Sequence, residues 1–187
     1  MVTVIEPVQL DDHVVLRLVT EHDAEALQAA YVRNRDHLAR WEPRRPDEFF
    51  TVEGQATRLK ALLEQQARGQ AVAWVLADGD RVVGRMTLND IVRGPFLNAH
   101  LGYWIDAEYL GRGLATKAVR EVCRIADQEL GLHRVAAATL LGNEASQSVL
   151  RKCGFELFGT APRYLEIDGR WQDHRQYQLI LNDRPAF

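Results

Sequence analysis

The chain has 187 residues, of which 47% are apolar and 26% charged, and its formal net charge is −3. These values predict one globular domain over residues 1–187 and argue against direct binding of nucleic acid. The cysteines, Cys123 and Cys153, predict neither a disulfide framework nor a metal site. Because no apolar run approaches the roughly 18 residues of a membrane span, we expect a reduced, cytoplasmic protein without a membrane partner.

The N-terminal part of the chain predicts a strand followed by helical segments. Residues 14–20 alternate in the manner of a strand, and residues 21–41 show helical spacing with several breaks. Residues 41–49 contain two prolines and predict a loop. Residues 51–69 predict a helix that begins after Thr51 and stops at Gly69.

The remaining elements alternate between strands and helices. Residues 71–78 and 81–91 predict a hairpin around Gly79-Asp80, and residues 98–106 predict a third strand. The later elements are a helix from about Gly111, a strand at 133–141, a helix at Glu144–Lys152, and strands at 155–167 and 171–181 around Asp168-Gly169. This order predicts an α+β protein with a mixed sheet covered by helices.

Gly111 and Gly113 form a turn directly before the long amphipathic segment. Glycine lets backbone N–H groups approach a ligand, and the N-terminus of a helix attracts anions. A lone Gly-x-Gly is equally well explained as a simple chain turn. About thirty residues later Asn143 opens a second helix, which Gly154 ends, and helix capping alone would explain both residues. On neighbouring strands, however, the two motifs could hold one elongated ligand.

Together, "YLGRGLATKAV" (109–119) and "NEASQSVLRKCGF" (143–155) resemble the acyl-CoA-binding core of the GNAT superfamily, the Gcn5-related N-acetyltransferases. The first family motif is Gln/Arg-x-x-Gly-x-Gly/Ala, and here Leu110 stands in the Gln/Arg place. That departure removes a side-chain contact and keeps every backbone donor.

Four further strings resemble the ribosomal-protein N-terminal acetyltransferases of the RimJ/RimL type, especially the RimJ branch: "NRDHLARWEP", "NDIVRGPF", "LGYWID" and "YLEIDGRWQDH". The resemblance runs from about Val14 to Leu181. It implies the GNAT fold, a twisted, mostly antiparallel sheet of about seven strands with a splayed parallel pair and flanking helices.

The resemblance also implies acetyl-CoA as cosubstrate, with no metal. The pyrophosphate would lie on a segment formed by Gly111, Arg112, Gly113, Leu114, Ala115 and Thr116. Backbone groups of Trp104 and Ile105 would pair with the pantetheine arm, and Asn143 would reach its amide. For Asn143, capping of its helix is the competing role.

For the chemistry, the resemblance implies direct attack of an amine on the thioester in a ternary complex. Many members protonate the leaving thiolate with a Tyr that is absent here, and Ser146 stands where RimL-like relatives use a Ser. Ser146 could instead only bond its own backbone. For the general base, Glu42 and His100 are equal candidates, with Glu166 or a water chain as further options.

The acceptor is expected to be the N-terminal α-amine of a protein or peptide, possibly a ribosomal protein, bound by Trp41, Arg93 and Tyr164. A small amine such as an antibiotic, an aminoacyl compound or a polyamine is the alternative, and a non-catalytic acyl-CoA-binding module is a third. An open trough flanked by Arg44 and Arg45 would suit a peptide, whereas a closed acidic pocket would suit a small amine. Monomer and homodimer both remain open.

Overall fold

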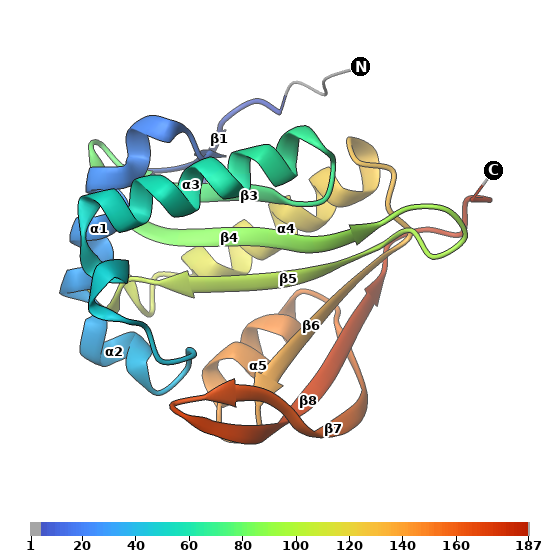
Figure 1. Ribbon diagram of the computed structural model, residues 1–187. Helices are drawn as coiled ribbons and strands as arrows, with labels where there is room; N and C mark the ends of the chain where they lie inside the picture. Colours follow the sequence, from blue (N-terminus) through green and yellow to red (C-terminus); the bar gives the residue numbers. More distant parts are fainter. Residues whose placement is uncertain (1–4, 187) are drawn as a thin grey trace.

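The computed structural model describes residues 5–186. Its centre is an eight-stranded sheet with the order β1-β2-β3-β4-β5-β6-β8-β7 (Figure 1). The strands are β1 (Val8–Gln9), β2 (Val14–Leu18), β3 (Val72–Asp78), β4 (Arg81–Val92), β5 (Asn98–Ile105), β6 (Arg134–Leu140), β7 (Glu156–Ile167) and β8 (Arg170–Ile180). The predicted α+β class is confirmed. The prediction of about seven strands missed β1, which is too short to show a hydrophobic period.

Helices cover the sheet on both faces (Figure 1). They are α1 (Ala24–Arg33), α2 (Arg35–Ala39), α3 (Val52–Ala67), α4 (Leu114–Gln128) and α5 (Glu144–Lys152), with short 3-10 helices η1 (Glu21–Asp23), η2 (Asp47–Phe50) and η3 (Ala107–Tyr109). Asn34 separates α1 from α2, because its side chain donates to the Ala30 carbonyl at 2.9 Å and accepts from the Ala107 N–H at 2.9 Å. The expected break in this helical segment therefore has a tertiary role. The single domain over residues 1–187 stays a prediction.

The one parallel pair among the described strands, β5 with β6, is short. Pairing covers only Asn98–His100 against Arg134–Ala136, although both strands continue beyond it. Past this point the two strands diverge, as Figure 1 shows. The divergence leaves one backbone edge of each strand without a ladder partner over its C-terminal half.

Successive residues of β5 point to opposite faces of the sheet. Leu101, Tyr103 and Ile105 pack in the apolar cluster that includes α4, whereas Trp104 packs in the cluster formed with α1 and α3. Where β5 and β6 diverge, the side chains of β5 therefore reach both faces of the sheet. We name the gap between the two diverging strands the β5–β6 opening.

Candidate active site

The glycine turn forms the start of α4. Gly111 and Gly113 have φ angles of 77° and 74°, in the left-handed region, and Gly113 is the N-cap. A Cβ at either position would meet no atom within 4 Å, so the need for glycine is conformational and not steric within the protein. The first turn of α4 holds no acidic residue. Its amides and the helix dipole therefore favour an anion.

The basic side chains at this turn are directed to the protein. Arg112 donates to the Glu108 carbonyl at 3.1 Å and lies 4.3 Å from the centre of the Tyr109 ring. Lys117 donates to the Leu10 carbonyl at 2.8 Å. The anion-binding character of the turn thus comes mainly from backbone amides.

The strand register shows which backbone groups at the end of β5 are hydrogen-bonded to β4. Trp104 lies opposite Arg85, and the Asp106 N–H donates to the Val83 carbonyl at 2.9 Å. Because bonding alternates along an antiparallel ladder, Trp104 bonds β4, and the N–H groups of Tyr103 and Ile105 face the β5–β6 opening. The expectation that Trp104 offers a free backbone group is therefore wrong. Ile105 does have a backbone N–H without a partner in the sheet.

Asn143 and Ser146 lie at the start of α5. Asn143 is the N-cap, and its side-chain oxygen accepts the Ser146 N–H at 3.1 Å. Capping uses the oxygen and leaves the Nδ2 group, so the two roles proposed for Asn143 are compatible.

Ser146 contacts a residue that the sequence did not point to. The Tyr103 hydroxyl lies 2.8 Å from Ser146 Oγ and 3.3 Å from the Ser146 carbonyl. Burial raises the pKa of Tyr103 to about 12. The alternation in "LGYWI" could have placed Tyr103 on the α4 face, but no sequence pattern links it to a helix 43 residues away.

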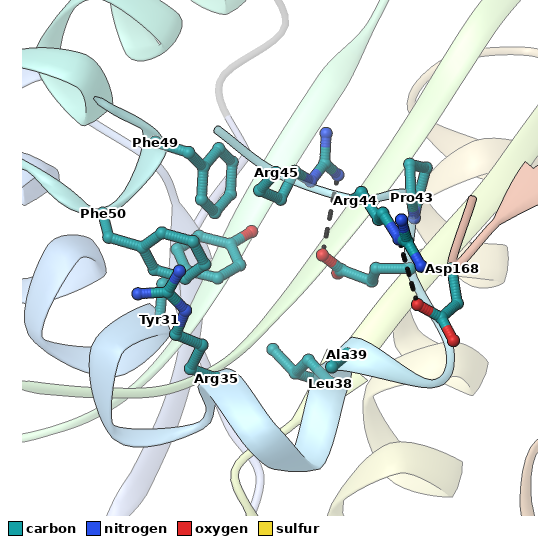
Figure 2. Close-up of a pocket in the computed structure, with 11 residues that line it drawn as sticks. Tyr31, Arg35, Leu38, Ala39, Pro43, Arg44, Arg45, Phe49, Phe50 and Asp168 are labelled. Atoms are coloured by element: carbon teal, nitrogen blue, oxygen red, sulfur yellow. Dashed lines mark hydrogen bonds and ion pairs between the residues drawn. The ribbon is translucent and has the colours of Figure 1, made fainter. Parts of the chain in front are cut away.

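A cavity of about 220 Å³ lies on the other face, between α1, α2, η2 and the turn that joins β7 to β8 (Figure 2). Its lining residues are Tyr31, Arg35, Leu38, Ala39, Glu42, Pro43, Arg44, Arg45, Phe49, Phe50 and Asp168. Burial raises the pKa of Glu42, although Arg45 at 3.6 Å and Arg85 oppose this effect. A carboxylate with a raised pKa is a stronger base than an exposed one.

Contacts with distant segments fix the wall of this cavity. The Asp168 N–H donates to the Glu42 carbonyl at 3.3 Å. Arg44 Nε donates to the Asp168 carboxylate at 3.3 Å (Figure 2). On the opposite side, the Tyr31 hydroxyl accepts from the Trp104 indole at 3.1 Å. Through Trp104 the cavity is joined to β5 where that strand borders the β5–β6 opening.

The other predicted catalytic and acceptor residues lie outside the cavity lining. His100 is half-buried on the same face of β5 as Trp104, at the last position paired with β6. Trp41 is half-buried next to Glu42, and its N–H donates to the Leu38 carbonyl at 2.8 Å. Arg93 donates to the Leu130 carbonyl, which follows the C-terminal end of α4. Arg93 therefore does not line the cavity. It lies at the opposite end of α4 from the glycine turn.

Tyr164 packs against a buried histidine that sequence reasoning missed. The rings of Tyr164 and His174 are 5.4 Å apart, and His174 is 3% exposed. His174 Nδ1 lies 2.9 Å from the Gln172 carbonyl, which can only accept, so Nδ1 carries the proton. The "WQDH" string belongs to the family resemblance, but no sequence pattern indicates a role for this side chain.

Comparison with known proteins decides the family. The profile of the acetyltransferase (GNAT) domain matches residues 13–156. The chain belongs to this family. A GNAT relative, the [ribosomal protein uS5]-alanine N-acetyltransferase of Escherichia coli (strain K12), is 35% identical over 174 residues, which cover 92% of this chain and 90% of the relative. The protein is accordingly an N-acetyltransferase.

Solved GNAT structures agree with the fold. The ribosomal-protein-S5-alanine acetyltransferase from Vibrio fischeri superimposes with a TM-score of 0.91 at 36% identity, covering 95% of this chain and 98% of that chain. Mycobacterium smegmatis RimJ in complex with CoA-disulfide gives a TM-score of 0.86 at 28% identity, covering 92% and 85%. Homologues of this GNAT protein thus bind CoA.

The residues of this GNAT chain fit such a ligand. The open space around Gly111 and Gly113, and the free edge of β5 at Ile105, match a phosphate group followed by an extended arm. Within residues 5–186, no group of three or more His, Cys, Asp or Glu side chains is arranged to hold a metal ion. Over the same residues, no helix has the length and apolarity of a membrane span.

Proposed function

We propose that this GNAT enzyme transfers the acetyl group of acetyl-CoA to the N-terminal α-amine of a polypeptide, with a ribosomal protein as the acceptor and the cytoplasm as its place of action. The observation that carries the proposal is the cavity containing Glu42 beside the β5–β6 opening. The cavity supplies a half-buried carboxylate as base on one face of the sheet, and the glycine turn supplies an anion site for the cosubstrate. The names of the similar proteins support the acceptor class.

In the cofactor half, the amides of residues 111–116 bind the pyrophosphate, and Asn143 Nδ2 donates to a pantetheine carbonyl. The Ile105 N–H faces the opening and donates to the thioester carbonyl. This bond strengthens as the carbonyl oxygen becomes negative in the tetrahedral intermediate. CoA, when bound, supplies the activated thioester.

In the acceptor half, Glu42 takes a proton from the α-ammonium group, and the neutral amine then attacks the thioester carbon. A C–N bond forms and the C–S bond breaks. The nitrogen releases its second proton to water, and Ser146 donates its proton to the leaving sulfur and regains one from water. His100, on the same face of β5, is the alternative base and would act through one water.

The acid–base demand favours an α-amine over a lysine side chain. An α-ammonium has a pKa of about 8, whereas a lysine ε-ammonium has a pKa near 10.4. A carboxylate with a raised pKa deprotonates the first far more readily. We therefore propose an N-terminal residue as the acceptor, and a small residue such as Ala or Ser is the one we expect.

A small free amine is the second candidate, because a cavity of about 220 Å³ is small and bounded by Phe49, Phe50 and Tyr31. The arginines around it distinguish it from the acidic pocket expected for a polyamine. Of small amines, one that also carries an anionic group would fit best.

A matched acceptor survey tests the proposal. Peptides that begin with Ala or Ser, the same peptides with a blocked N-terminus and one internal Lys, and free small amines are compared at equal concentration by release of the CoA thiol. We expect open N-termini to give the highest kcat/KM, by about 10-fold or more. Faster turnover of the blocked peptides or of the free amines would refute the N-terminal acceptor.

A further inference from the structure

Tyr103 connects β5 with α5 through its side chain. It lies on the diverging part of β5, and its hydroxyl reaches Ser146 Oγ on α5 at 2.8 Å. Its ring packs with the core cluster that includes α4, so the hydroxyl is held in place by the ring. The contact therefore joins a strand and a helix on the CoA face of the sheet.

Either hydroxyl can donate in the contact between Tyr103 and Ser146 Oγ. The Ser146 carbonyl, 3.3 Å away, is a carbonyl of α5 and is directed to the amide one turn on, so Oγ is the nearer and freer acceptor. When Tyr103 donates to Oγ, the serine proton is free for another partner.

The direction of this bond decides where the serine proton points. A serine hydroxyl has one proton and rotates freely unless a partner fixes it. When Oγ accepts from Tyr103, the serine proton has to point away from the tyrosine. Without Tyr103, the Ser146 hydroxyl could turn its proton to a carbonyl of its own helix, which is the non-catalytic role of serines in helices.

We propose that Tyr103 is a positioning residue, which holds Ser146 so that its hydroxyl proton is directed at the sulfur of the leaving CoA. The inference rests on the role of Ser146 in the proposed function. As the C–S bond breaks, its electron pair goes to sulfur, sulfur takes the proton of Oγ, and Ser146 regains a proton from water. The Tyr103 O–H stabilises the serine oxygen while that oxygen lacks its proton.

A double-mutant cycle tests the proposal. Tyr103→Phe, Ser146→Ala and the double variant are compared with the unaltered enzyme for kcat, for the KM of acetyl-CoA and for CoA affinity by calorimetry. We expect Tyr103→Phe to lower kcat by about 10-fold, the effect of one hydrogen bond made in the transition state, with CoA affinity changed less than about 2-fold. In the Ser146→Ala background the same change should have no further effect on kcat.

The matched control is Tyr177→Phe, which also removes a hydroxyl from a tyrosine of the same core cluster but on β8. It should leave kcat unchanged, and thermal melting should show that all variants fold. Equal losses from Tyr103→Phe with and without Ser146 would overturn the proposal, as would an unchanged kcat in Tyr103→Phe. The cycle uses whichever amine the acceptor survey selects, so a failure here is distinct from a wrong acceptor class.

Discussion

The proposed cofactor half and the proposed acceptor half of the site consist of different chemical groups. The cofactor half is mainly backbone from one continuous stretch, in which Gly111 and Gly113 adopt left-handed conformations before α4. The acceptor half consists of side chains from α1, α2, η2, the loop at residues 41–46 and the β7–β8 turn. Asp168 and Glu42, which are in contact there, are 126 positions apart in the chain.

Because of this difference, the two halves should respond differently to substitution. A backbone site tolerates most side-chain changes and fails when the backbone conformation or its charge environment changes. A site made of side chains loses activity when a single group is removed, while the cofactor still binds. Substitutions that affect kcat alone and substitutions that affect CoA affinity alone should therefore fall into the two halves.

Glu42→Gln should give the largest effect. Loss of the base should lower kcat by about 100- to 10,000-fold, with CoA affinity unchanged. Since a base acts when deprotonated, activity of the unaltered enzyme should fall as pH drops through the raised pKa of Glu42, and the variant should lose this acid limb. Glu48→Gln is the control, because Glu48 is an exposed residue of η2 outside the cavity lining. If His100→Gln instead removes the acid limb, His100 is the base.

Gly113→Asp should weaken CoA binding by about 100-fold, because it strains a left-handed position and adds a negative charge at the N-terminus of α4. Gly69→Asp is a matched control, since Gly69 has a φ of 70° and equally open surroundings. It should cost stability without changing CoA affinity in calorimetry. Equal affinity losses in both variants would show that strain alone is responsible.

Asp106→Asn tests the junction between the halves, because Asp106 follows β5 and accepts from Arg33 of α1 at 2.8 Å. Asp106 is 0% exposed. We expect the free energy of unfolding to fall by about 2 kcal/mol, measured by urea denaturation at neutral pH.

The pH dependence of that difference follows from the pKa of Asp106. Burial alone would raise this pKa, but hydrogen bonds from the Glu108 N–H and from Arg33 outweigh burial and lower it. A lowered folded-state pKa contributes stability above the ordinary carboxyl pKa, and this contribution disappears as pH falls through the lowered value. The gap between the two proteins should therefore narrow in acid. A gap that stays constant would contradict an ionised Asp106.

Arg93→Ala should give the smallest effect, less than about 2-fold in kcat/KM, because its guanidinium donates to Leu130 at the far end of α4. A large rise in the KM of the acceptor would instead support the role expected from the sequence.

The secondary-structure elements of the proposed cofactor half could largely be predicted from the sequence because their signals are local. The glycine turn, the Asn143 cap and the strands before them each leave a pattern within a few residues. The register pairs the backbone of Trp104 with β4 and leaves that of Ile105 free, and the sequence could not separate the two because register is a tertiary property. The two-residue strand β1 was missed because it has too few positions for a period.

The acceptor half could be predicted only in part. Glu42 was identified through resemblance, but the chain alone does not show that Arg45, Tyr31 and Asp168 surround it. Arg93 was grouped with the acceptor loops, although its loop lies at the other end of β5. Likewise, the contact between Tyr103 and Ser146 arises only when β5 and α5 are packed together.

The most direct test of the account is a crystal structure of the enzyme with CoA and a peptide that begins with Ala. We expect the pyrophosphate on the amides of residues 111–116 and the pantetheine arm in the β5–β6 opening against Ile105. The peptide amine should lie within about 3.2 Å of the Glu42 carboxylate or one water away from it. A peptide amine that lies away from the cavity, or a CoA arm that lies outside the opening, would contradict it.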